Sequence, residues 1–300
     1  MPALVDQIVE IMLSSLANST LNQYLKVWSS FFIFLEEAKL RCHFSKLNCR
    51  HVLYFLMSMS NSGLSPTTIT SKMSALNYMF KLFKLADPSQ DFWVKSFLSG
   101  LRKCNPQTDT RVPILLDTLQ SMIAMLSKLC LNSYDLRLYK VMFSMAFHAF
   151  LRPGEMTGLI NNLQLDHCRL LKKCIILTFF KYKHHKGPPY TIKVCETKSS
   201  DCPVYLLRKF LKYRRSKPGP LFCLKNGKHV TYSRFAKIFH CVISSINING
   251  KFSPHSFRIG AASWAAMNGA SDDEIRRMGR WSNNSVLKYI RIPTISLKKM

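Results

Sequence analysis

The sequence predicts a mainly α-helical protein with a small β-hairpin, an α+β fold in which a helical bundle precedes a larger second domain. Apolar residues make up 47% of the 300 residues, enough to build packed cores, and over most of the chain they recur at spacings of three and four. One β-rich run, residues 174–183, interrupts that period. A polar stretch without any period, residues 102–112, is expected to link a first domain at 1–101 to a second at 113–300.

The first domain is expected to be a bundle of four or five helices. Its longest apolar face runs from Leu21 to Leu35, directly after Ser19 and Thr20, which suit a helix start. The other segments with a helical period are 49–59, 66–83 and 92–101. Ser65-Pro66 and Asp87-Pro88 mark turns between them.

The second domain is expected to open with two helices, at about 116–131 and 135–150, and then to change to strands. A Gly187-Pro188-Pro189 turn separates the β-rich run from a second one at 190–194, so the two runs predict a hairpin. Helices resume after it, at about 202–215, 231–246, 256–268, 271–279 and 285–291.

The charge of the chain is far from balanced. There are 43 Lys and Arg against 16 Asp and Glu, a formal net charge of +27, and residues 172–237 alone hold 17 basic and 2 acidic side chains. Such an excess favours an anionic partner, nucleic acid first and acidic membranes second. No apolar run reaches the ~18 residues of a membrane span, and Asp6 and Glu10 stand where a signal peptide would carry positive charge. An intracellular protein without a membrane segment is therefore expected.

The ten cysteines form no recognisable metal pattern. No two are at the Cys-x-x-Cys spacing of a zinc site, and the nearest cluster, Cys42, His43, Cys49 and His51, matches no common zinc module. Reduced, mostly buried thiols are the expected state. Because no Gly-rich phosphate loop is present either, neither a metal nor a nucleotide cofactor is predicted.

Four patches of the second domain carry residues suited to phosphate chemistry, and each also has an ordinary alternative. Arg152 stands before Pro153 at the mouth of a helix, where backbone N–H groups favour a phosphate, and Glu155 follows three residues on. Alone, this arginine resembles a surface residue at a helix cap. The hairpin carries several lysines that can reach into a groove or active site, and a solvated run of charge is the alternative.

The other two patches lie nearer the end of the chain. His255 and Arg258 share one face at a spacing of three, although a chance His-x-x-Arg pair is common. Tyr289 lies among basic residues near the end of the chain. Its ordinary alternative is a role in packing, which is usual for a tyrosine on a terminal helix.

In this order, over about 140 residues, the four patches resemble the catalytic domain of the tyrosine recombinases, also called the phage integrase family. Outside the site, residues 65–76, 87–88 and 98–102 look like the family's helical, SAM-like core-binding domain, which implies that the first domain binds DNA. The short sequence Gly279-Arg280-Trp281-Ser282 is most similar to that of eukaryotic members, as in Crypton- and DIRS-type mobile elements.

The resemblance implies a role for each matching residue. Tyr289 would be the nucleophile, and Arg152 and Arg258 would clamp the scissile phosphate, with Glu155 in the acidic support position beside the first. His255 would assist proton transfer. A tyrosine phenol, with a pKa of about 10, is a weak nucleophile at neutral pH, so such cations are needed to stabilise its phenolate and the transition state.

The hairpin lysines divide between catalysis and DNA binding. Lys183 matches the lysine that protonates the leaving 5′ oxygen, and Lys181 and Lys186 are weaker candidates for that general acid. In the basic stretch as a whole, Lys181, Lys186, Arg214 and Arg215 are predicted to contact DNA.

The sequence departs from the family's pattern in two places. Nine residues before the nucleophile, where the family places a His or Trp, stands Arg280, with Trp281 beside it, so either could be the sixth phosphate contact. A glycine common before the first arginine is replaced by Phe150-Leu151.

The function that the resemblance implies is site-specific recombination or integration. Such an enzyme cleaves and rejoins double-stranded DNA through a covalent 3′-phosphotyrosine, without metal or nucleotide, as a homodimer or homotetramer on paired sites, here with the nucleus as the expected location. Two alternatives stay open: a type IB topoisomerase, which shares this chemistry, and a domesticated protein that binds DNA without cutting it.

Overall fold

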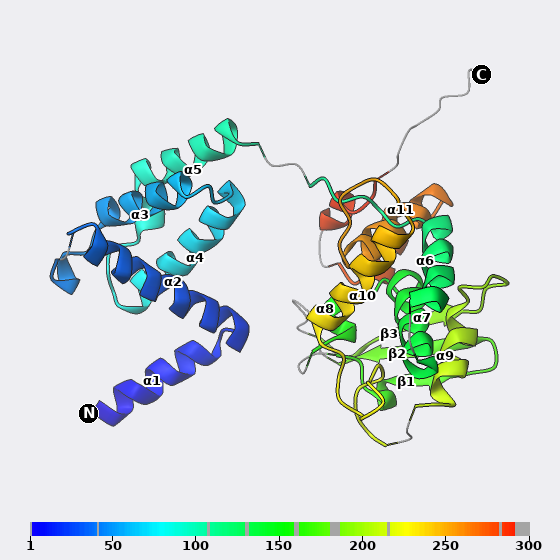
Figure 1. The fold of residues 1–300 in the computed structure, drawn as a ribbon. Coiled ribbons are helices and arrows are strands. Elements are labelled where there is room, and N and C mark those ends of the chain that lie inside the picture. The colour runs from blue at the N-terminus through cyan, green and yellow to red at the C-terminus, as the bar shows by residue number, and fades with distance from the viewer. Residues whose placement is uncertain are drawn as a thin grey trace. The chain divides into compact units, whose positions relative to one another are not determined.

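The chain folds into two compact units, Met1–Asp109 and Thr110–Met300, each with its own hydrophobic core. The computed structural model describes residues 2–40, 42–106, 109–129, 132–158, 162–180, 187–214, 217–281 and 284–291. The first unit is drawn in blue to teal in Figure 1 and the second in green to red. No helix among these residues is both long enough and apolar enough to cross a membrane.

The first unit is helical, as predicted. It contains α1 (Pro2–Ser14), α2 (Asn18–Glu37), α3 (Cys49–Asn61), α4 (Pro66–Leu82) and α5 (Phe92–Cys104), with 3₁₀ turns η1 (Phe44–Lys46) and η2 (Pro88–Gln90). The apolar face expected in 21–35 is the buried face of α2, where Val27, Phe31 and Leu35 pack against α3 and α4. Ser65 caps α4 by accepting the backbone N–H of Thr68, which is the turn chemistry that the sequence indicated.

Two features of this unit differ from the prediction. Helix α1 was not expected. Its described side chains bury no apolar face that a periodic pattern could reveal, since Leu4 is 60% and Ile11 71% exposed. Helix α5 continues through Cys104, three residues into the predicted linker. Its last turn carries Arg102 and Lys103, whose charges interact favourably with the helix C-terminus.

The second unit combines helices with one small sheet. The helices are α6 (Leu116–Leu129), α7 (Ser133–His148), α8 (Pro153–Met156), α9 (Pro203–Leu211), α10 (Tyr232–Ser245), α11 (Ser256–Met267) and α12 (Asp272–Gly279), with 3₁₀ turns η3 (Leu165–His167) and η4 (Asn284–Lys288). The strands are β1 (Cys168–Leu170), β2 (Cys174–Phe179) and β3 (Tyr190–Cys195). The predicted fold class, mainly α with a small antiparallel sheet, is confirmed.

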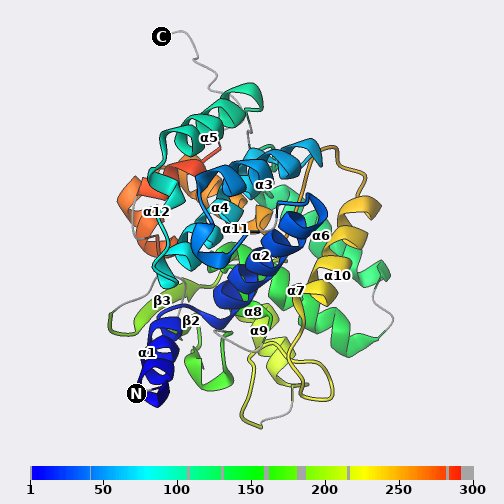
Figure 2. The ribbon, with the colours of Figure 1, turned by 90° about the vertical axis from the view of Figure 1, so that its left-hand side faces the viewer.

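The sheet is antiparallel, in the order β1-β2-β3. The predicted hairpin is the β2–β3 pair, which runs side by side in Figures 1 and 2, with Cys174 opposite Cys195 and Phe179 opposite Tyr190. Strand β1 was not predicted because three residues are too few to show alternation. The last predicted helix, at 285–291, is the 3₁₀ turn η4 instead.

Helices α7 and α11 form the centre of this unit and position the site. Helix α11 is buried on all sides over its first two turns. At Gly260 an added Cβ would lie 1.7 Å from the carbonyl oxygen of Ile114, so only glycine allows the backbone at Ile114 to pass so close to α11. The Ile114 N–H donates to the carbonyl of Ser256 at 3.1 Å, which fixes the start of α11.

Candidate active site

Arg152 follows α7 and is held by Glu155 in the single-turn helix α8. Glu155 Oε2 accepts the backbone N–H of Arg152 at 2.8 Å, and its Oε1 accepts the guanidinium of the same residue at 3.0 Å. The guanidinium also donates to the carbonyl of Arg280 at 3.3 Å. Since the Arg152 side chain is 19% exposed, it is fixed in one pose while one edge stays open to solvent.

Arg280 binds the same carboxylate from the other side. Its guanidinium donates to Glu155 Oε2 at 2.7 Å and to the carbonyl oxygens of Phe150 and Met278 at 3.2 and 3.1 Å. The side chain is fully buried, with its Cζ atom 4.0 Å from the centre of the Phe179 ring. Arg280 ends α12 with a φ of 54°, a left-handed conformation that turns the side chain into the interior.

Arg258 lies in the first turn of α11, fully buried beneath Trp281. Its two terminal nitrogens donate to the carbonyl oxygens of Phe150 and Gly279. The Cζ atom lies 3.9 Å from the centre of the Trp281 ring, in a cation–π contact. Backbone oxygens and an aromatic ring therefore hold this guanidinium, while its Nε has no hydrogen-bond partner among the described residues.

Tyr289 meets His255 and Trp281 at the outer side of this cluster. The Tyr289 Oη is 3.1 Å from His255 Nε2, and its ring lies 4.9 Å from the Trp281 ring at an angle of 54°. Ser263 of α11 holds the backbone here, since its hydroxyl donates to the Tyr289 carbonyl at 3.2 Å and accepts the Arg291 N–H at 2.8 Å. No feature of the sequence indicated this role of Ser263.

Gly279 makes room for the Trp281 ring. A Cβ at this position would lie 1.5 Å from the indole, so any other residue would push Trp281 away from Arg258. A glycine directly before Arg280 and Trp281 is a sequence signal for a close approach, but only the fold shows that the approaching group is the Trp281 ring.

The cluster carries excess positive charge. Burial alone would raise the pKa of Glu155, but the guanidinium groups of Arg280, Arg152 and Arg258 lower that pKa below its ordinary value, so the carboxylate is ionised. Burial, with the neighbouring Arg152 and Arg280, lowers the pKa of Arg258 well below its usual range. Three guanidinium groups against one carboxylate leave two positive charges in excess, which suits the binding of an anion.

The structure brings most of the predicted catalytic residues together. The residues that lie in this one cluster are Arg152, Glu155, His255, Arg258, Arg280, Trp281 and Tyr289. The remaining candidates, Lys181, Lys183, Lys186 and Arg215, lie outside the described residues.

Arg214 does not face solvent, contrary to the predicted DNA contact. It is 6% exposed, and its guanidinium donates to the carbonyl oxygens of Lys217, Gly219, Pro220 and Leu221 at 2.7 to 3.3 Å. These hydrogen bonds hold the backbone of residues 217–221 against a buried guanidinium.

His43 and His51 of the first unit take part in helix caps. His43 Nδ1 is 2.7 Å from the Ser45 hydroxyl in the cap of η1, and His51 Nδ1 is 3.0 Å from Asn48 Oδ1 in the cap of α3. Over the described ranges, no group of three or more His, Cys, Asp or Glu residues could hold a metal ion. Nine cysteines in those ranges are free thiols.

A helical unit is thus followed by a unit in which three arginines, a histidine and a tyrosine lie in one cluster with Glu155. The sequence of residues 114–292, more than half of the chain, matches the phage integrase family. The chain therefore belongs to this family, that of the tyrosine recombinases. No sequence match is found among curated proteins.

Solved structures share the fold across nearly the whole chain. The integrase of transposon Tn1549, in complex with transposon right end DNA, has a TM-score of 0.66 at 15% identity, over 96% of this chain and 95% of that one. The XerH recombinase bound to a palindromic difH substrate has 0.68 at 15% identity, over 90% and 75%. A lambda integrase dimer bound to a COC′ core site has 0.63 at 11% identity, over 100% and 79%. Identities this low show the fold alone.

Proposed function

We propose that this protein is a site-specific DNA recombinase that cleaves and rejoins double-stranded DNA through a 3′-phosphotyrosine formed on Tyr289. The observation that carries the proposal is the 3.1 Å contact between Tyr289 Oη and His255 Nε2, beside the arginine cluster. A nucleophile within hydrogen-bond reach of a base, next to cations, is the arrangement that activates a phenol. Membership of the tyrosine recombinase family agrees with it.

The arginines stabilise the charge that develops at phosphorus. A phosphodiester carries one negative charge and its pentavalent transition state two, which matches the two positive charges in excess around Glu155. Arg152 offers its solvent-exposed edge, and Arg258 lies behind it. Attack of the Tyr289 oxygen forms the P–O bond to the enzyme, His255 takes the phenol proton, and the 5′ oxygen leaves with a proton.

Trp281, in our proposal, fills the family's His/Trp place, one residue later than the family's register. It is the side chain that contacts both Arg258 and Tyr289, whereas Arg280 contacts Glu155. Because the Trp281 ring covers Arg258, a phosphate reaches that guanidinium only when the ring shifts outward. Arg280 then acts through Glu155 on the pose of Arg152, as a positioning residue.

Lys183 is proposed as the general acid on the strength of the family resemblance. Two contacts at the ends of the hairpin support it, because they tie both strands to the site. Phe179 at the end of β2 lies under the Arg280 guanidinium, and the Tyr190 hydroxyl at the start of β3 donates to the carbonyl of Arg277 at 3.1 Å.

The partners follow from the charge and from the neighbours. A net charge of +27 suits duplex DNA, and the solved neighbours named above are complexes with DNA, one of them a dimer. We propose a homodimer or homotetramer on paired sites, without metal or nucleotide cofactor. The sequence around Trp281 supports an origin in a eukaryotic Crypton- or DIRS-type mobile element, and we propose that the protein acts in the nucleus.

Covalent trapping tests this proposal. Wild type and Tyr289→Phe are incubated with a randomised library of nicked duplexes, separated under denaturing conditions, and the protein-linked DNA is sequenced. The expected adduct forms only with Tyr289, on a 3′ phosphate with a free 5′ hydroxyl. An equal adduct in both proteins contradicts the nucleophile, and binding without an adduct favours a non-cleaving DNA-binding protein. Relaxation of supercoiled plasmid without site dependence would indicate a topoisomerase.

A further inference from the structure

A second group of cations surrounds a cavity between α7 and α9. The cavity has a volume of about 490 Å³, within the range of small-ligand sites. The residues that line it are Leu136, Arg137, Lys140, Ser200, Tyr205, Leu206, Lys209, Lys212 and Tyr213. Four of them are basic, and among these described lining residues none is acidic.

This cavity is distinct from the candidate active site. Lys140 precedes His148, the last residue of α7, by eight positions, which is about 12 Å of helix rise, and Arg152 lies beyond that end. None of the residues around Glu155 lines the cavity.

Two tyrosines form the walls of the cavity, and each carries a cation on one face of its ring. The Arg137 Cζ atom lies 3.8 Å from the centre of the Tyr213 ring, and the Lys209 Nζ atom lies 4.4 Å from that of Tyr205. Both rings stay accessible, with Tyr205 47% and Tyr213 53% exposed. Aromatic surface and positive charge therefore alternate along the opening.

Two carboxylates adjoin lining residues along the chain, Asp135 beside Leu136 and Asp201 beside Ser200, and Asp135 pairs with Arg234 at 3.2 Å. Asp201 follows Ser200, but its side chain is fully buried, 2.6 Å from His148 Nε2 and 3.0 Å from the side-chain nitrogen of Gln120. Neither carboxylate lines the cavity.

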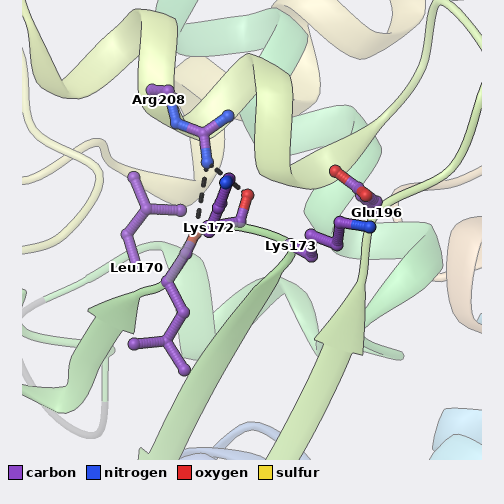
Figure 3. Close-up of a pocket in the computed structure, with 6 residues that line it drawn as sticks. Leu170, Lys172, Lys173, Glu196 and Arg208 are labelled. Atoms are coloured by element: carbon purple, nitrogen blue, oxygen red, sulfur yellow. Dashed lines mark hydrogen bonds between the residues drawn. The ribbon is translucent and has the colours of Figure 1, made fainter.

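A second hollow, beside Arg208 of α9, provides a contrast (Figure 3). There Arg208 donates to the carbonyl oxygens of Leu171 and Lys172 at 3.1 and 2.8 Å, so its guanidinium holds the β1–β2 turn. Glu196 also lines that hollow, with Lys173. Basic residues alone do not make an anion site. Arg137 in the α7–α9 cavity also donates to a backbone carbonyl, that of Ser133 at 2.5 Å, so the two places differ in the Glu196 carboxylate and in the tyrosine rings.

We propose that the α7–α9 cavity binds a segment of single-stranded nucleic acid, with phosphates on Arg137, Lys140, Lys209 and Lys212 and bases against Tyr205 and Tyr213. A positively charged groove with aromatic side chains is how proteins bind single strands, because unpaired bases expose their ring faces. A duplex stacks its bases inside and would leave both tyrosines without a partner. Tyr205 lies in the first turn of α9 and Tyr213 lies two residues past its end, so the two rings stand at different places along the cavity, which suits two successive nucleotides better than one.

Photocrosslinking maps this site directly. An oligonucleotide of about eight residues carrying 5-iododeoxyuridine is irradiated with the full chain, in a Tyr289→Phe background, at about 0.15 M salt, and crosslinked peptides are identified by mass spectrometry. We expect crosslinks at Tyr205 or Tyr213. Lys209→Glu with Lys212→Glu should reduce them about tenfold, whereas the matched control, Lys172→Glu with Lys173→Glu, should change them less than about twofold.

Several outcomes overturn the proposal. Crosslinks that map only to other residues contradict the proposed site. Equal losses of crosslinking in both double variants show that only the overall positive charge of the protein matters. Equally strong competition by a duplex of the same sequence, or by a glutamate-rich peptide of equal charge, shows that unpaired bases are not what the cavity recognises. Because the background lacks the nucleophile, failure here is independent of whether the protein cleaves DNA.

Discussion

The candidate active site and the α7–α9 cavity both gather cations on one unit but hold them in opposite ways. In the active site, Arg258 and Arg280 are buried and bound by backbone oxygens, and Glu155 bridges two arginines. In the cavity, two of the four cations, Arg137 and Lys209, lie against tyrosine rings, and Lys209 and Lys212 are exposed. The first arrangement fixes each charge in one position, whereas the second carries the Lys209 and Lys212 charges at the ends of exposed side chains.

The difference follows from the cost of burying charge. A guanidinium taken out of water needs hydrogen-bond or ionic partners around it, and those partners then determine where it lies. Such a charge can act on one atom of a substrate, as catalysis requires. An exposed ammonium costs little and can follow a variable ligand, as binding requires.

The largest effect is expected from removing the charge at the centre of the buried cluster. Glu155→Gln keeps the volume but leaves three guanidinium groups without their carboxylate. We expect the free energy of unfolding to fall by about 3–5 kcal/mol, measured by urea denaturation near neutral pH.

A matched control is the exposed ion pair of α12. Asp273→Asn removes a carboxylate 2.8 Å from Arg276, where the two side chains are 65% and 39% exposed. The expected loss is below about 1 kcal/mol, because solvent screens the pair. Similar losses for Asp273→Asn and Glu155→Gln would contradict the view that burial makes the carboxylate essential.

The second effect concerns Asp201, the carboxylate that the fold directs away from the cavity. Burial would raise its pKa, but hydrogen bonds from His148, Ser199 and Gln120 lower it to about 2. A lowered folded-state pKa stabilises the protein above the unfolded pKa of about 3.9 and loses that contribution as the pH falls towards 2.

The full contribution of Asp201 amounts to about 2–3 kcal/mol, of which about 1 kcal/mol is lost by pH 3. Urea unfolding of wild type and Asp201→Asn between about pH 6 and 3 measures it. The gap between the two proteins should narrow as the pH falls. A gap that stays constant over this range would mean that the carboxylate titrates as it does in the unfolded chain.

Much of the fold could be predicted because buried helix faces leave a period in the sequence. Helix α2 shows this with Phe31 and Leu35. The described side chains of α1 bury no such face, and β1 is only three residues long, so neither left a signal. The predicted change to strands followed from β-branched and aromatic residues, and the structure places β2 and β3 there.

The site was predictable in residue type but not in orientation. Arg152, His255 and Tyr289 could be chosen from their order along the chain, and they lie in one cluster. The spacing count that suggested Arg280 for a phosphate contact could not show its φ of 54°, which turns the side chain towards Glu155. Likewise, a basic run predicts exposure, and only the folded turn shows that the Arg214 guanidinium is enclosed.

The third prediction concerns the space under Trp281. In Gly279→Ala the new methyl group would overlap the indole, so Trp281 has to shift from Arg258. We expect a loss of about 1–3 kcal/mol in the free energy of unfolding, together with a changed yield of the covalent adduct. Gly100→Ala in α5 is the control, since nothing lies within 4 Å of its added Cβ. It should be neutral or stabilise by up to about 1 kcal/mol. Equal effects at both positions would argue against a packed indole at Gly279.

The smallest effect on stability is expected in the cavity, where function and stability should separate. Lys209→Ala with Lys212→Ala removes one cation–π contact with Tyr205 and also relieves repulsion among like charges, and these effects oppose each other. The free energy of unfolding should change by less than about 0.5 kcal/mol, although the oligonucleotide crosslinks at the tyrosines should weaken. A loss above about 1 kcal/mol would show that these lysines, like the buried arginines, are part of the packed structure. The distinction between the buried cations of the active site and the exposed cations of the cavity would then fail.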